Sequence, residues 1–392
     1  MVKIYNDSFI NLYSQTSLNF DLLSFYNDWK VRYLKSVENS SPLEEYLYYA
    51  LDQPTANNAV TVSEAMGYGL VIFSLMSKFD ATAKAHFTYL YNYIKSFPSI
   101  YNNNLMAWQQ IKNANGDIVN AESETSSATD GDMEISYGLL LAHKIWGVND
   151  EINYKTEAIK RIKALMDSCV NKKDYILTLG DWVKGIKENN YKFVTRCSDF
   201  LIYHIKEFIE FDTENSKEWE LVIEKINSII SEQMNNLSKY NGLMPDFLIK
   251  DNLSYIPPKG KILESNHDGD YYYNSCRIPW RYSMDIILNG TPVTNQLHNL
   301  NEWIKNTTFY NPDNIKSGYY IINDYPGKPF GISNDLSFIA PFLVSSIIEK
   351  GNDNWTISLW KSLMNKPITK CTFYENTLKL LAMIVVTGNW IP

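Results

Sequence analysis

The stretch "TVSEAMGYGL", residues 61–70, has the apolar spacing of a helix that is fit for burial. Met66, Leu70 and Phe73 recur at positions i, i+4 and i+7, which lie on one helical face. Helical periodicity of this kind returns along the whole chain, while clear alternating strand patterns are scarce. We therefore predict an all-α domain of many paired helices. The other helical patterns cover residues 135–146, 156–170, 217–234, 341–351 and 375–388.

One acid, Glu64, lies inside this apolar stretch, and the nearest charged residues along the chain are Asp52 and Lys78. Burial of a lone carboxyl group disfavours its charged form and so suits a general acid. A structural glutamate in a buried ion pair is the alternative. Gly67 and Gly69 cost about 1 kcal/mol each against alanine in a helix, but they let a ligand or a neighbouring backbone come close.

The composition excludes several classes of function. The 392 residues carry a net charge of −8, which argues against nucleic acid as a partner. The longest apolar runs are too short to cross a bilayer, so we expect no membrane partner. The four cysteines are widely spaced and HExxH is missing, so we expect no metal and no cofactor. With 28 Tyr and 10 Trp, the chain is rich in flat rings, which pack in cores and also stack on sugars.

Two long segments, 101–130 and 240–275, show few helix signals and many polar and aromatic residues. Long loops in a compact domain are often functional, so we expect the chemistry where these loops meet helix ends. At the end of the first segment, Asp130 and Asp132 begin a predicted helix. At least one of them is expected to cap it, and the pair could instead hold the hydroxyls of a ligand.

The second long segment leads into a region that is rich in acids and in tyrosines. Arg277, Arg281 and Asp285 follow at i, i+4 and i+8, on one helical face. A solvated acidic loop before an ordinary helix is the alternative to a site. The acids that precede the tyrosines are Glu264, Asp268 and Asp270.

Taken together, these regions resemble glycoside hydrolase family 8. The likeness rests on the segment around Glu64, on the "ATDGD" helix start and on "YYYNSCRIPWR", with supporting matches at "NNLMAWQQ", "GDW", "TRCSDF" and "GLMPDF". The resemblance implies an (α/α)6 barrel whose long loops form a sugar-binding cleft at one end. It also implies an inverting, endo-acting hydrolase of β-1,4-linked polysaccharides, with no cofactor.

Residue by residue, the resemblance makes Glu64 the proton donor and Asp130 the acid that binds the sugar where the bond is cut. Many members have an aspartate as general base at the position of Asn274, and an amide cannot take that role. A second branch of the family has asparagine there and a glutamate base in the loop just upstream, which matches Glu264. The residues that match sugar-contacting or positioning residues are Trp108, Trp182, Tyr273 and Arg277, beside Asn274 itself.

The sequence therefore predicts one catalytic domain over residues 1–392 that cleaves β-glucan, cellulose, lichenan or chitosan. The acids Glu122, Glu124, Asp268 and Asp270 are candidates for contacts with chitosan amines. The alternatives are a non-catalytic carbohydrate-binding barrel and an exo-acting hydrolase or lyase of the same fold. The first residues lack a signal-peptide pattern, yet a polymeric substrate is met outside the cell. We therefore expect the mature domain of a secreted monomer.

Overall fold

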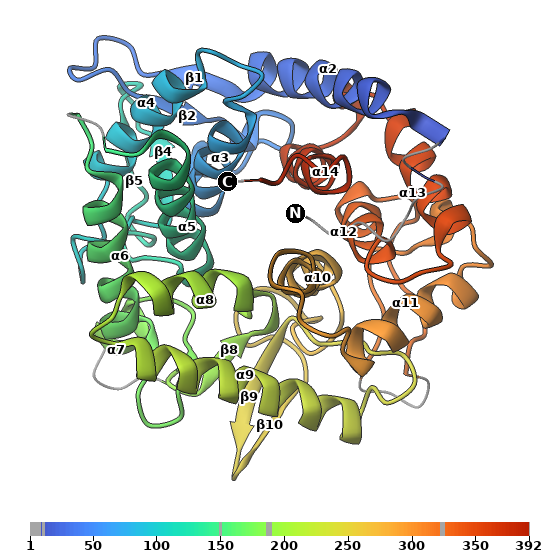
Figure 1. The fold of residues 1–392 in the computed structure, drawn as a ribbon. Helices are drawn as coiled ribbons and strands as arrows, with labels where there is room; N and C mark the ends of the chain where they lie inside the picture. Colours follow the sequence, from blue (N-terminus) through green and yellow to red (C-terminus); the bar gives the residue numbers. More distant parts are fainter. Residues whose placement is uncertain (1–8, 10–11, 149–150, 186–189, 322–325, 392) are drawn as a thin grey trace. The chain divides into compact units, whose positions relative to one another are not determined.

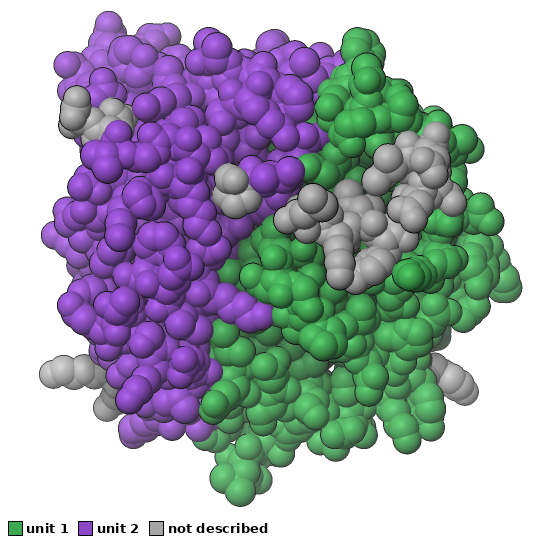
Figure 2. Space-filling model, viewed as in Figure 1, with its two compact units in different colours: residues 1–22, 193–203, 222–388 green, residues 23–192, 204–221, 389–392 purple. Residues whose placement is uncertain are grey.

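A computed structural model describes the chain at residue 9 and over residues 12–148, 151–185, 190–321 and 326–391. Helices dominate these residues (Figure 1). The chain divides into two compact units, which Figure 2 shows in two colours. Unit 1 comprises residues 1–22, 193–203 and 222–388, and unit 2 comprises residues 23–192, 204–221 and 389–392.

Most elements of the first half of the chain belong to unit 2. Its strands form two antiparallel pairs, β1–β2 and β6–β7, and a three-stranded antiparallel sheet in the order β3-β4-β5. The elements are β1 (Leu34–Ser36), β2 (Glu45–Leu47), η1 (Tyr49–Leu51), β3 (Ala59–Val62), α3 (Ser63–Met76), α4 (Ala83–Ser96), β4 (Gln109–Lys112), β5 (Ile118–Asn120), α5 (Thr129–Trp146), α6 (Tyr154–Ser168), β6 (Val170–Asn171), β7 (Ile176–Leu177) and α7 (Trp182–Gly185).

Unit 1 holds the elements of the second half. Its three-stranded antiparallel sheet has the order β10-β9-β8. The elements are β8 (Val194–Arg196), η2 (Cys197–Asp199), β9 (Phe247–Asp251), β10 (Ser254–Ile256), η3 (Ser275–Arg277), α10 (Ile278–Asn289), α11 (Asn295–Thr307), η4 (Pro312–Asn314), α12 (Leu336–Ser346), α13 (Asp353–Asn365), η5 (Ile368–Lys370) and α14 (Phe373–Val386).

Three helices contribute residues to both units. They are α2 (Gln15–Tyr33), α8 (Ile202–Phe211) and α9 (Ser216–Asn236). The first residues belong to unit 1, which otherwise comes mainly from the second half of the chain, and the last residues belong to unit 2, which comes mainly from the first half. Phe9 belongs to unit 1, where its ring lies 5.5 Å from that of Trp360. Trp390 belongs to unit 2, where it is fully buried and its Nε1 donates to the Tyr137 hydroxyl at 3.3 Å.

The glycines of α3 admit neighbouring elements to close contact. A Cβ at Gly67 would lie 2.6 Å from the Cβ of Glu134 on α5. On α5 itself, a Cβ at Gly131 would meet the Ser63 side chain, and one at Gly138 would meet Leu70. Helices α3 and α5 therefore pack with their backbones close together, side by side in Figure 1. The predicted close approach at Gly67 is made by a helix.

The strands were largely missed by the sequence prediction. β4 and β5 lie inside the predicted loop 101–130, and β9 and β10 lie inside 240–275. Each of these strands has three to five residues, which is too short to establish an alternating pattern. Among the described residues, no helix is both long and apolar enough to cross a membrane.

Candidate active site

Glu64 lies in the first turn of α3, where the chain leaves β3. The Ser63 N–H at this helix start donates to the Trp108 carbonyl at 2.8 Å, so the loop before β4 is tied to the start of α3. The Glu64 side chain is half-buried, and its Oε1 accepts from the Tyr68 hydroxyl one turn later at 2.8 Å. The acid is thus held at a helix start, where the helix dipole favours a negative charge.

Asp130 and Asp132 have different surroundings, and neither caps α5. The residue at the N-cap position is Ala128, without a side-chain hydrogen bond. Asp130 is buried, and its Oδ1 accepts from the Gly131 N–H at 2.9 Å. The predicted cap is therefore wrong, because the chain enters the helix two residues before Asp130.

Asp132 is a structural acid. Its carboxylate is completely buried, accepts from the Met106 N–H at 3.0 Å and forms an ion pair with Arg161. Burial raises the pKa of Asp132 to about 7, although Arg161 and the Met106 N–H oppose that shift. Asp132 therefore ties the loop that leads to Trp108 onto α5, and its oxygens are occupied by protein.

The two tryptophans of the prediction belong to unit 2 and are half-buried. Trp108 precedes β4, and its N–H donates to the Ser126 carbonyl at 2.7 Å. Trp182 begins α7, and its ring meets Tyr191 edge-on with centroids 5.1 Å apart. Both rings keep part of their surface exposed, as stacking on a sugar requires.

Glu264 lies in the long loop of unit 1 between β10 and η3. Its side chain is 45% exposed, yet both oxygens have partners. Oε1 accepts from Arg196 Nη2 at 3.0 Å, and Oε2 accepts from Asn274 Nδ2 at 2.7 Å. An exposed carboxylate fixed from two sides has the orientation and the access to solvent that a base acting on water needs.

Asp268 organises the loop that carries Glu264. Its buried carboxylate accepts four backbone N–H groups, and only 1% of the residue is exposed. The predicted contact with a ligand amine is therefore wrong, and so is the solvated alternative, because the oxygens are engaged within the loop. The donors are Ile262 at 2.8 Å, Leu263 at 2.7 Å, Glu264 at 3.2 Å and Ser265 at 2.8 Å.

Asn274 lies between two carboxylates. Its Nδ2 donates to Glu264 and also to Asp246 Oδ2 at 3.3 Å, and its Oδ1 accepts from Arg277 Nη2 at 2.8 Å. Only 7% of Asn274 is exposed, and its amide fixes Glu264 Oε2 by a hydrogen bond. An aspartate there would face two other acids, whereas an amide donates to both.

Asp246, from "GLMPDF", binds the segment that carries Asn274. Asp246 received no role from the sequence. It accepts the backbone N–H groups of Tyr272, Asn274 and Ser275 at 3.0, 3.2 and 2.7 Å. Burial raises the pKa of Asp246 to about 7. The motif marked the segment, but only the fold reveals that its acid lies beneath the tyrosine run.

Arg277 and Arg281 share one face, as their spacing predicts. Arg277 Nη2 donates to Ser198 Oγ and Arg281 Nη1 donates to the Ser198 carbonyl, both at 2.9 Å. Burial lowers the pKa of Arg277 to about 9. The neighbouring Tyr273 is 36% exposed and donates its hydroxyl to Asp335 Oδ2 at 2.8 Å. Unlike the two buried arginines, Tyr273 thus keeps part of its side chain at the surface.

The candidate residues thus form two groups. Unit 2 holds Glu64 and Asp130 with the tryptophans, and unit 1 holds Glu264 with Asn274 and Arg277. Over the described parts of the chain, no cluster of three or more His, Cys, Asp or Glu could bind a metal ion.

Comparisons with known proteins decide the family. The model of glycosyl hydrolases family 8 matches residues 24–388. The chain belongs to that family. It is 38% identical over 381 residues to a beta-glucanase of Niallia circulans, covering 97% of this chain and 87% of the relative. It is 35% identical over 390 residues to an endoglucanase of Bacillus sp. (strain KSM-330), covering 97% and 78%.

A solved structure supports the same assignment. The apo beta-1,3-1,4-glucanase from Paenibacillus sp. X4 aligns with a TM-score of 0.87 at 37% identity, covering 96% of this chain and 94% of that one. The predicted all-α class, an (α/α)6 barrel, is confirmed by this likeness together with the family match. This family 8 chain is a glycoside hydrolase, as its sequence motifs predicted.

Proposed function

We propose that this family 8 enzyme is an inverting, endo-acting β-1,4-glycanase of β-glucans, with Glu64 as general acid and Glu264 as general base. The observation that carries the proposal is the geometry of Glu264. Its exposed carboxylate is held by Arg196 and Asn274, so it is oriented by the protein and still open to the water that a base must reach.

We assign Glu64 the complementary role because the segment around it matches the proton-donor motif of the family. It is half-buried at the start of α3 and accepts a hydrogen bond from Tyr68. A protonated Glu64 would donate to the leaving glycosidic oxygen, while Glu264 takes a proton from a water that attacks the opposite face of the sugar. Inversion requires the two carboxyl groups to lie roughly 6.5–9.5 Å apart in the assembled enzyme. Asp130 would bind the distorted sugar and stabilise its positive charge.

The preference for glucan rests on two observations. The relatives are described as a beta-glucanase, an endoglucanase and a beta-1,3-1,4-glucanase. In addition, Asp268 lies buried and bonded within its own loop, which removes one acid that chitosan amines would need. We therefore expect lichenan and other β-glucans to be cut faster than chitosan or xylan.

The test is release of reducing ends from lichenan, carboxymethylcellulose, chitosan and xylan by wild type, Glu264→Gln and Glu64→Gln. We expect wild type to cut a glucan and both variants to lose more than about 10³-fold in rate while binding oligosaccharide as before. A folded Glu264→Gln with the wild-type rate would remove the base assignment. If wild type cuts none of the four polymers, a carbohydrate-binding barrel becomes the better explanation.

Two product measurements complete the mechanism. Proton NMR of the first product formed should show the α-anomer, because inversion at a β-linkage changes the configuration. Viscosity should fall much faster than reducing ends appear if cleavage is internal. A β-anomer would contradict inversion, and one short product from the start would indicate an exo-acting enzyme.

Acid and base come from different units, so we propose that residues 1–392 act as one catalytic domain. We also propose a monomer that is secreted to reach its polymeric substrate. Light scattering of the purified chain checks that it is a monomer. Fractionation of the producing cells checks that it is secreted. A dimer, or enzyme retained inside the cells, would contradict the corresponding proposal.

A further inference from the structure

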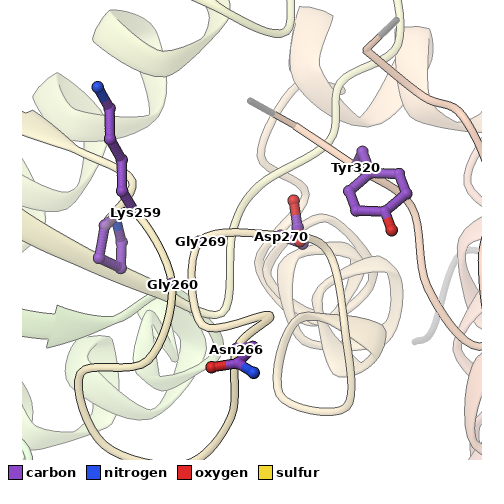
Figure 3. A pocket seen from close by; sticks show the side chains of 7 residues that line it. Lys259, Gly260, Asn266, Gly269, Asp270 and Tyr320 are labelled. Atoms are coloured by element: carbon purple, nitrogen blue, oxygen red, sulfur yellow. The ribbon is translucent and has the colours of Figure 1, made fainter. Parts of the chain in front are cut away.

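A hollow of about 360 Å³ lies in unit 1 beside the loop that carries Glu264. Pro258 and Lys259 form one side, and Asn266, Asp270 and Tyr320 line the remainder (Figure 3). In that view the side chains of Asp270 and Tyr320 lie on one side of the hollow and Lys259 on the other. Its volume falls near the lower end of small-molecule sites, about 300–1,000 Å³, and suits one small ring.

Two lining residues of the hollow, Asp270 and Tyr320, are held by their neighbours. Asp270 is 9% exposed, and its Oδ2 lies 2.9 Å from His267 Nδ1 while its Oδ1 accepts from the Ile321 N–H at 3.1 Å. Each carboxylate oxygen has a second lone pair, so Asp270 can still accept from hydroxyl groups. The Tyr320 ring is braced by Phe330, with centroids 4.6 Å apart.

The charges of the hollow balance, so they select neither an anion nor a cation. Lys259 and Asp270 carry opposite charges on its two sides, so an ion of either sign is attracted by one and repelled by the other, and an uncharged polar ligand is as well suited. The amide of Asn266 and the hydroxyl of Tyr320 add donors and acceptors without charge. Hydroxyl groups around a compact ring match this set, and a glucosyl residue has that chemistry.

The hollow is also part of the structure of the base loop. Asn266, Gly269 and Asp270 lie within the six residues that follow Glu264 in the chain, and they line the hollow. A Cβ at Gly269 would lie 2.1 Å from the Pro258 carbonyl oxygen, so the loop packs tightly against the segment that forms the other side. A ligand that fills the hollow would contact both segments and restrict the loop.

We propose that this hollow is a second sugar-binding site, which takes one uncharged glucosyl residue and holds the base loop when it is filled. The identity of the sugar rests on the proposed function, whereas the binding chemistry does not. Long glucan chains would thus bind more tightly than short ones and order the loop around Glu264.

The test is calorimetric binding of cello-oligosaccharides of two to six residues, in a Glu264→Gln background that prevents turnover. Asn266→Ala and Tyr320→Ala each remove a lining group, and Tyr240→Ala, an exposed tyrosine elsewhere in unit 1, is the matched control. We expect both lining variants to weaken binding of the longer oligosaccharides about tenfold and the control to leave it unchanged. Asn266 is exposed, so its variant should fold even if Tyr320→Ala disturbs Phe330.

Equal affinities of all variants at every length would overturn the second site. This result is distinguishable from failure of the proposed function. If the lining variants weaken binding but wild type hydrolyses nothing, the site stands and the hydrolase proposal fails. If wild type hydrolyses glucan and the lining variants bind as tightly as the background protein, the hydrolase proposal stands and the site does not exist.

Discussion

Replacing Asp268 by asparagine should misplace the general base without removing it. Asp268 Oδ2 accepts three backbone N–H groups of the base loop, and Oδ1 accepts the Ser265 N–H. An asparagine oxygen at the Oδ2 position keeps three of these bonds in a neutral form, but its NH2 group then faces the Ser265 donor. Bonds to a charged acceptor contribute about 1.5–3 kcal/mol and neutral ones about 0.5–1.5 kcal/mol.

The loop therefore loses on the order of 4 kcal/mol of ordering free energy. About 2.7 kcal/mol on the barrier already corresponds to a 100-fold loss of rate. We expect Asp268→Asn to lower kcat on lichenan about 100-fold, with KM changed little and the melting temperature lowered by a few degrees. Asp251→Asn, an exposed acid of β9, is the control. A folded Asp268→Asn with kcat within a factor of two of wild type would refute the reasoning.

Three further predictions concern the helix pair and the buried acids. Gly67→Ala places a Cβ 2.6 Å from that of Glu134, and we expect a loss of about 1–3 kcal/mol in urea unfolding; an unchanged midpoint would contradict the close packing. Tyr68→Phe removes one hydrogen bond to the Glu64 carboxylate, and a donor to a carboxylate favours its ionised form, so the basic limb of the kcat–pH profile should move to higher pH. A shift to lower pH would speak against Glu64 as the acid. Burial raises the pKa of Asp246 from 3.8 to about 7. Between pH 3.8 and about 7, Asp246 is therefore protonated in the folded protein and ionised in the unfolded chain. Stability should then fall, by at most about 4 kcal/mol, as pH rises from about 4 to 7, and level off above; Asp246→Asn should flatten this fall, and an equal slope in both proteins would show that another group titrates.

The helices were readable from sequence because their apolar spacing persists over several turns. α3 contains all of Met66, Leu70 and Phe73, and the start of α5 lies near the predicted Asp130. The short strands could not be read, since three to five residues inside a polar loop show no reliable period. The local sequence pattern therefore predicted the helices but not the short strands inside the loops.

The candidate site shows a similar division. The motifs pointed to Glu64 and Glu264, whose assignments as acid and base stay predictions until kinetics tests them. The sequence could not assign the acids around Glu264, because the donors that occupy Asp246 and Asp268 are backbone N–H groups. Every residue except proline carries such a donor, so no residue type marks it. "GLMPDF" and "TRCSDF" did mark the segments that supply Asp246 and Arg196.

Unit 2 cannot be complete until late in synthesis, because residues 389–392 belong to it. Unit 2 begins with residues 23–192 but takes its buried Trp390 from residues 389–392, about 200 positions later. Trp390 donates to Tyr137 on α5, the helix that packs against the one carrying Glu64. The core of unit 2 is thus complete only once Trp390 has been synthesised, so a nascent chain that stops short of residue 390 lacks the buried indole that packs on the early half.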